Sequence, residues 1–137
     1  MKKYYAVVDT NVIVSGLITN NPASPTKGVV DYLTDYTIVP LYCDEILKEY
    51  QEVLNREKFH LPEAKIKEIL DLIKSDGLSL RRTASKKQFP DPKDVVFYEV
   101  ALSKEESFLV TGNIKHFPEV DFVVTPAEMM SIIEKDL

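Results

Sequence analysis

The stretch "YYAVVDTNVIV", residues 4–14, decides the fold because it places three polar residues between two apolar runs. Residues 4–8 are typical of a buried strand, and residues 12–14 are equally apolar. Burying the carboxylate of Asp9 at this junction is unfavourable unless a partner compensates for its lost hydration. Two partners are open at this point: the amides of a helix that Asp9 caps, or a metal ion.

The rest of the chain alternates short β-rich runs with longer runs of helical period. Turn residues in "TNNPASP", residues 19–25, separate the first two helical runs. Strands that alternate with helices predict a parallel sheet covered on both faces, and the length fits one domain over residues 1–137. We expect helices over residues 11–18, 25–34, 43–59, 61–77, 91–105 and 126–137, and strands over residues 4–8, 36–42, 78–82, 107–112 and 121–125.

The bulk composition argues against several classes of protein. With 137 residues and 45% hydrophobic content, the chain can build the core of an ordinary soluble domain. No apolar run reaches the roughly 18 to 20 residues that span a bilayer, and we expect no export signal. Cys43 is the only cysteine, which favours the cytoplasm, and His60 and His116 form no metal-ligand pattern. The net charge of −5 argues against simple coating of nucleic acid, but not against a nuclease.

Polar residues follow two of the expected strands at the point where each strand ends. Asp9 follows the first strand, and the sequence Thr111, Gly112, Asn113 follows the strand that ends near Val110. Ligands of open parallel sheets bind beyond the carboxyl ends of the strands, so these side chains are candidates for one site. An N-cap at Asp9 and an ordinary turn at Asn113 are the alternatives.

The helical run over residues 43–59 carries several acids, and one of them borders its apolar face. That face consists of Ile46, Leu47, Tyr50, Val53 and Leu54. At about 100° per residue, Glu49 lies nearer to this face than Asp44, Glu45 or Glu52. A carboxylate at the border can reach a cleft beside the sheet, although a solvated helix face also explains all four acids.

Two acids lie at the start of the late helical run. Asp91 followed by Pro92 resembles an N-cap with proline at the first helical position, which places Asp94 at the third. The helix dipole favours a carboxylate there, so capping explains both acids. Asp94 also shares a face with Phe97, Tyr98 and Ala101, which points it inward and makes it a candidate ligand.

Several segments, in this order, resemble the PIN-domain nucleases. "VVDTNVIVSGL" (residues 7–17) resembles their opening strand with its D-T-N or D-T-S element, and "DEILKEYQEVLNREKF" (44–59) resembles their central acidic helix. "DPKDVVFYEVALSKEESFLVTGNIKHF" (91–117) resembles their late D…A…TGD/TRN segment. "NPASPTKGVVDYL" (21–33) resembles the subgroup described as toxin components of toxin–antitoxin systems, relatives of the VapC toxins.

The resemblance covers nearly the whole chain and implies a three-layer α/β/α sandwich with a central, mainly parallel sheet. It implies an acidic cluster that holds Mg²⁺ or Mn²⁺ and cuts RNA. Carried over by position, Asp9, Glu49 and Asp94 match three family acids that are catalytic and bind metal. Asp94 is preferred to Asp91 because of its seven-residue spacing to Ala101. With Asp9 as a ligand, helix capping would fall to a neighbouring polar residue, either Thr10 or Asn11.

The resemblance also identifies weaker positions of the site. Asn113 falls at the fourth acidic position of the catalytic set, where many relatives carry Asp, which leaves the number of metal ions open. Asn11 and Thr111 match supporting polar positions around the acids. RNA requires positive charge nearby, and a solvated surface is the alternative explanation for the basic residues that flank the acids. These RNA-contact candidates are Arg56, Arg81, Arg82, Lys86, Lys87 and Lys93.

The sequence therefore predicts a cytoplasmic Mg²⁺- or Mn²⁺-dependent endoribonuclease, the toxin of a toxin–antitoxin pair. Its expected partners are RNA, a small antitoxin protein and a second copy of the chain, and no membrane. Apolar helix surfaces that include Tyr32, Leu33 or Leu47 are candidates for the dimer interface. One alternative is a catalytically weakened PIN-fold module that binds RNA or protein, as Asn113 suggests. The other is a haloacid-dehalogenase phosphatase, which usually has Asp where this chain has Asn11.

Overall fold

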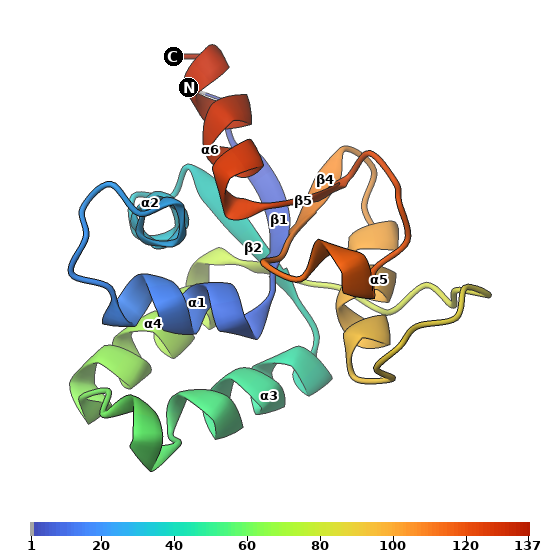
Figure 1. Cartoon of the computed structure of the whole chain (residues 1–137). Coiled ribbons are helices and arrows are strands. Elements are labelled where there is room, and N and C mark those ends of the chain that lie inside the picture. The colour runs from blue at the N-terminus through green and yellow to red at the C-terminus, as the bar shows by residue number, and fades with distance from the viewer. Residues whose placement is uncertain (1) are drawn as a thin grey trace.

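An all-parallel, five-stranded sheet forms the centre of the computed structural model, which describes residues 2–137 (Figure 1). The order of its strands is β3-β2-β1-β4-β5, and every neighbouring pair runs parallel. The strands are β1 (Tyr4–Val8), β2 (Ile38–Tyr42), β3 (Leu78–Ser79), β4 (Ser107–Val110) and β5 (Val123–Val124). The expected parallel α/β architecture is confirmed.

Helices connect these strands and cover the sheet. They are α1 (Thr10–Ile18), α2 (Pro25–Thr34), α3 (Asp44–Leu54), α4 (Glu63–Asp76), α5 (Asp94–Leu102) and α6 (Pro126–Lys135). Neighbouring residues of a strand point to opposite faces. Accordingly, the Tyr4 hydroxyl donates to Asp136 just after α6, whereas the Tyr5 ring lies under Lys104, 4.2 Å from its Nζ, just after α5. Helices α5 and α6 therefore cover opposite faces, which gives three layers.

The local sequence explains how several of these helices begin and pack. Thr125 and Glu128 form a reciprocal capping box ahead of α6. Helix α2 packs against α6 at Gly28, where an added Cβ would lie only 2.4 Å from the side chain of Met130. The sheet itself is buried by apolar residues such as Val7 and Leu109, which have no exposed surface. No helix within the described residues is long and apolar enough to cross a membrane.

Two helices, α3 and α5, differ most from the lengths that the sequence predicts. Helix α3 ends at Leu54, and a separate 3-10 turn (Glu57–Phe59) follows, closed by His60 in a left-handed conformation with φ of 50°. Helix α5 begins at Asp94 and not near Pro92. The amide of Lys93 donates to Asp91 Oδ1 at 2.9 Å, and the amide of Asp94 donates to the Asp91 carbonyl at 3.0 Å. These bonds close a turn before the helix, so placing Asp94 at the third helical position is wrong.

Two hydrogen bonds continue the sheet beyond the ends of its strands. The amide of Asp9 donates to the Val110 carbonyl at 2.9 Å, and the amide of Thr111 donates to the Val124 carbonyl at 2.9 Å. Asp9 and Thr111 therefore lie side by side at the carboxyl edge of the sheet, the edge at which ligands of open α/β folds bind.

Candidate functional site

Asp9 is the most buried acid at the carboxyl edge, with only 6% of its surface exposed. Its Oδ2 accepts a 2.7 Å hydrogen bond from the hydroxyl of Thr111, which is itself fully buried. Burial raises the pKa of the Asp9 carboxyl above its ordinary value of 3.8, although Thr111 and the amides of Asn11 and Thr10 favour the charged form. Local hydrogen bonds therefore compensate only partly for the desolvation of this carboxylate.

The cap of α1 differs from the expectation that Thr10 or Asn11 would supply it. Asp9 occupies the N-cap position, and its side chain forms no capping hydrogen bond. Thr10 is the first helical residue and turns its hydroxyl toward Glu49. Asn11 is exposed at the surface of the helix. The carboxylate of Asp9 therefore lies near the first amides of α1 and makes its hydrogen bond to Thr111.

Two hydroxyl groups hold Glu49 beside Asp9. The hydroxyl of Thr10 donates to Glu49 Oε2, and the buried hydroxyl of Tyr50 donates to the carbonyl of Val8 at the end of β1. Burial raises the pKa of Glu49, the Thr10 hydrogen bond opposes this, and the negative charge of Asp9 raises it further. Glu49 is partly buried, as its predicted position at the border of the apolar face implies.

Asp94 completes the group of acids from the start of α5. Its Oδ2 is buried and makes no hydrogen bond. The Nδ1 of His116 lies 3.3 Å from that oxygen. Burial raises the pKa of Asp94, and the charges of Asp9 and Asp91 add to the rise, while His116 opposes it. By contrast, Asp91 is exposed and its side chain is used by the turn before α5.

The remaining predicted positions contribute differently. Thr111 binds Asp9 and also accepts a 3.0 Å hydrogen bond from the amide of Asn113. Asn113 itself is exposed, as is Asn11. The structure thus brings Thr111 to the acids, and it leaves the side chains of the two asparagines at the surface of the molecule.

The donor set suits a divalent cation, but it is not arranged around one. Carboxylate oxygens are the ligands that Mg²⁺ prefers, and Asp94 Oδ2 is buried without a hydrogen bond. Within residues 2–137, however, no three Asp, Glu, His or Cys side chains converge closely enough to hold an ion. Asp9 and Glu49 are hydrogen-bonded to Thr111 and Thr10, so side-chain rotations are required to gather the three carboxylates around an ion.

A groove of about 280 Å³ lies next to these acids, between α3 and the start of α5. Charges of both signs line it, and Glu49 opens onto it. The groove is lined by Glu45, Lys48, Glu49, Glu52, Val53, Arg56, Arg82, Pro92, Lys93 and Val96. The charge of Lys93 lowers the pKa of Glu49, which places its ammonium within electrostatic reach of the acid site.

The predicted RNA-contact residues fall into three groups. Arg56 and Lys93 line the groove. Arg81, Lys86 and Lys87 are exposed along the segment between β3 and α5. Arg82 differs from both groups, because its guanidinium is paired with two carboxylates, those of Glu45 and Glu99. These pairs give Arg82 an intramolecular role, and its contact with RNA stays a prediction.

The PIN domain family matches residues 5–115, and the chain belongs to this family. Its fold is therefore of the nuclease type, and PIN-domain nucleases generally use divalent metals. A search of curated proteins gave no match to the chain.

Sequence reasoning missed two residues of the site, Thr10 and His116. Thr10 lies in the D-T-N element, and its position directly after Asp9 was a usable signal. His116 had no such signal, because its contact with Asp94 depends on the 3-10 turn Ile114–His116 that folds back after β4.

Proposed function

We propose that the protein is a metal-dependent endoribonuclease that hydrolyses RNA phosphodiester bonds at the carboxyl edge of its sheet. The observation that carries this proposal is the gathering of Asp9, Glu49 and Asp94 at the carboxyl edge, where Thr111, Thr10 and His116 contact their carboxylates. Burial raises the pKa of all three acids, and the charge of Asp9 adds to the rise at Glu49 and Asp94. Mutual repulsion of this kind is relieved by a bound cation. Structural acids, in contrast, normally acquire a cationic partner within the fold.

The three acids would hold Mg²⁺ or Mn²⁺, with Thr111 and Thr10 orienting the carboxylates of Asp9 and Glu49. When bound, such an ion stabilises charge on phosphoryl oxygens and lowers the pKa of water. His116, 3.3 Å from Asp94 Oδ2, is placed to hold that carboxylate in position from the side of β4. The residues thus supply both the ligands and their orientation.

The groove between α3 and α5 supports RNA as the substrate. Lys48, Arg56 and Lys93 bring cations to its walls, next to Glu49. Cationic side chains at such a position fix the phosphate backbone without reading its sequence. The net charge of −5 disfavours nonspecific binding of RNA over the surface as a whole.

We further propose that the protein acts in the cytoplasm as the toxin of a toxin–antitoxin pair, controlled by a small antitoxin and working as a homodimer. The resemblance of residues 21–33 to the toxin subgroup supports the toxin role. Tyr32 and Leu47 are partly exposed and are available for an interface. Leu33 is not, because it is buried in the core with 1% exposure, which corrects its inclusion among the interface candidates.

The test is cleavage of single-stranded RNA with Mg²⁺ or Mn²⁺, and with EDTA as the control. We expect Asp9→Asn and Asp94→Asn each to lower the rate by more than about 100-fold, since a correctly held ion contributes several kcal/mol to catalysis. Equal cleavage by the wild type and both variants would reject the assigned site. Metal-independent RNA binding without cleavage would instead favour the binding module that Asn113 suggests.

A further inference from the structure

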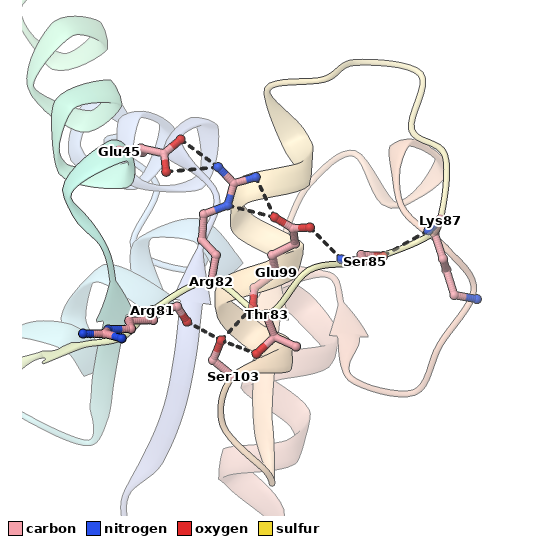
Figure 2. Close-up of polar contacts among 8 residues, drawn as sticks. All are labelled: Glu45, Arg81, Arg82, Thr83, Ser85, Lys87, Glu99 and Ser103. Atoms are coloured by element: carbon pink, nitrogen blue, oxygen red, sulfur yellow. Dashed lines mark hydrogen bonds and ion pairs between the residues drawn. The ribbon is translucent and has the colours of Figure 1, made fainter.

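The segment between β3 and α5, residues 80–93, is attached to two helices through one side chain. Arg82 Nη1 donates to Glu45 Oε1 at 3.0 Å and Oε2 at 2.8 Å (Figure 2). Its Nε donates to Glu99 Oε1 at 2.8 Å, and its Nη2 lies 2.6 Å from the same oxygen. Glu45 belongs to α3 and Glu99 to α5, so the guanidinium joins the two helices. We call Arg82, Glu45 and Glu99 the Arg82 clamp.

The α5 side of the clamp is firmly built. Only 9% of the Glu99 side chain is exposed, and its second oxygen accepts a 2.7 Å hydrogen bond from the amide of Ser85. Burial alone raises the pKa of Glu99, but the Ser85 amide and Arg82 outweigh it and lower that pKa below its ordinary value of 4.5. The amide of Thr83 also donates to the Glu99 carbonyl at 3.2 Å. Residues 82–85 are thus fixed along α5.

The clamp borders the groove described above, since Arg82 and Glu45 line it together with Glu49 of α3 and Val96 of α5. Glu45 lies four residues before Glu49 on α3, a rise of about 6 Å along a helix. Glu99 lies five residues after Asp94 on α5. Each end of the clamp is therefore little more than one helical turn from an acid of the candidate site.

We propose that Arg82 is a positioning residue, which holds α3 and α5 at the separation that lets Glu49 and Asp94 bind one divalent ion. This inference rests on the proposed function of the acidic site. The planar guanidinium suits the task because it presents several donors in a fixed fork and can bind two carboxylates at once. An ammonium group lacks that geometry, so lysine at this position should replace the charge but not the full separation of the helices.

The test titrates Mn²⁺ alone into the intact chain by calorimetry, at a temperature where every variant is folded. Loss of groups that orient metal ligands typically weakens metal affinity by about 10- to 100-fold. For Arg82→Met we expect a weakening of about tenfold, at the lower end of that range, because the clamp acts through two helices. Arg82→Lys should recover part of this loss. Lys67→Met is the matched control, because it removes an exposed ion pair with Asp71 on α4.

Two further measurements keep the inference falsifiable. Glu45→Gln releases only α3, and because the Glu45 side chain is 59% exposed the variant should fold even if Arg82→Met does not. It should weaken Mn²⁺ binding by a smaller factor than Arg82→Met. Hydrogen exchange of the Ser85 amide reports on the clamp without any metal, and it should become faster in Arg82→Met.

The outcomes separate this inference from the proposed function. Wild-type affinity for Mn²⁺ in both Arg82→Met and Glu45→Gln overturns the positioning role, even if the Ser85 amide exchanges faster. The absence of Mn²⁺ binding in the wild type rejects the metal-dependent function, and the positioning role with it. Weakened binding in the two clamp variants, with the Lys67→Met control unchanged, supports both.

Discussion

Two buried acids, Asp9 and Glu99, show what distinguishes the candidate site from the rest of the molecule. They are almost equally buried, with 6% and 7% of their surfaces exposed. Yet the pKa of Asp9 is raised and that of Glu99 is lowered. Burial pushes both upward, so the difference lies in their partners. Glu99 has the guanidinium of Arg82, whereas Asp9 has only hydroxyl and amide donors and lies near two further acids.

This contrast separates structural from functional use of buried charge. At the Arg82 clamp the fold provides its own cation, and every oxygen of Glu99 is hydrogen-bonded. At the carboxyl edge, Asp94 keeps a buried oxygen without a hydrogen bond. Carboxylates with shifted pKa values that lie in a cleft are typical of functional sites. A bound cation would supply positive charge to the three acids at the carboxyl edge.

The largest expected effect is stabilisation by the divalent cation that the proposed function requires. At a Mn²⁺ concentration 100 times its dissociation constant, the free energy of unfolding should rise by about 2.7 kcal/mol. Urea denaturation with and without MnCl₂ measures this rise. The double variant Asp9→Asn, Asp94→Asn is the control, and an equal rise in it would place the ion elsewhere.

The next largest effect is expected at the clamp. Arg82→Met leaves the carboxylate of Glu99 buried without its cation and should lower the free energy of unfolding by about 2 kcal/mol. This value lies below the usual loss of about 3–5 kcal/mol because 36% of the Arg82 side chain is exposed and screened by solvent. Lys67→Met should change stability by less than about 0.5 kcal/mol. Equal losses in the two variants, measured by urea denaturation, would contradict the structural role of Arg82.

Unlike Arg82→Met, the variant Asp9→Asn should raise the free energy of unfolding of the metal-free protein at pH 7. Because the pKa of Asp9 is raised in the folded state, its contribution to stability is full below about pH 4 and is lost as pH rises through the raised pKa. The variant should therefore exceed the wild type in melting temperature at pH 7, with the gap closing toward pH 4. A lower melting temperature than the wild type at pH 7 would show that the Asp9 charge is already compensated.

Glu99 provides the reverse pH dependence. Its pKa is lowered on folding, so its contribution is present above its ordinary value of 4.5 and is lost as pH falls through the lowered pKa. In Glu99→Gln this loss on acidification should be missing, which a series of melting curves from pH 3 to pH 7 would detect. If the variant loses as much stability as the wild type between pH 7 and pH 3, other carboxylates cause most of that loss.

The smallest effect is expected for Glu45→Gln, which removes the exposed arm of the clamp. Its side chain is 59% exposed, and ion pairs of this kind contribute about 0.2–1 kcal/mol. Urea denaturation at low and high salt should show a small loss that salt diminishes. A loss as large as that of Arg82→Met would assign the strength of the clamp to α3 and not to Glu99.

Much of the fold could be predicted from local patterns in the sequence. The strand Tyr4–Val8 and the helix Pro25–Thr34 match the predicted boundaries at both ends, because apolar runs and turn residues delimit them. The start of α5 was misplaced, since the Asp91 side chain closes a turn instead of capping the first helical turn. The sequence prediction extended α3 to residue 59. The structure instead forms a separate 3-10 turn over Glu57–Phe59.

Less of the candidate site could be predicted from the sequence, because several of its contacts join residues that lie far apart along the chain. Positions after strands, such as Asp9 and Thr111, follow from the topology of a parallel sheet. The Arg82 pairs do not, because Glu45 lies 37 residues before Arg82 and Glu99 lies 17 residues after it. A basic residue beside an acidic site suggested RNA contact, which stays a prediction, and nothing in the sequence indicated that Arg82 also pairs with carboxylates of the protein itself.

The central claim is that the carboxyl edge binds a divalent cation through Asp9, Glu49 and Asp94. The most direct test is the anomalous difference density of a crystal soaked in MnCl₂. We predict a manganese peak between the carboxylates of Asp9 and Asp94, with Glu49 within reach of the ion. The absence of a peak at this edge, or a peak bound only elsewhere on the molecule, would contradict the claim.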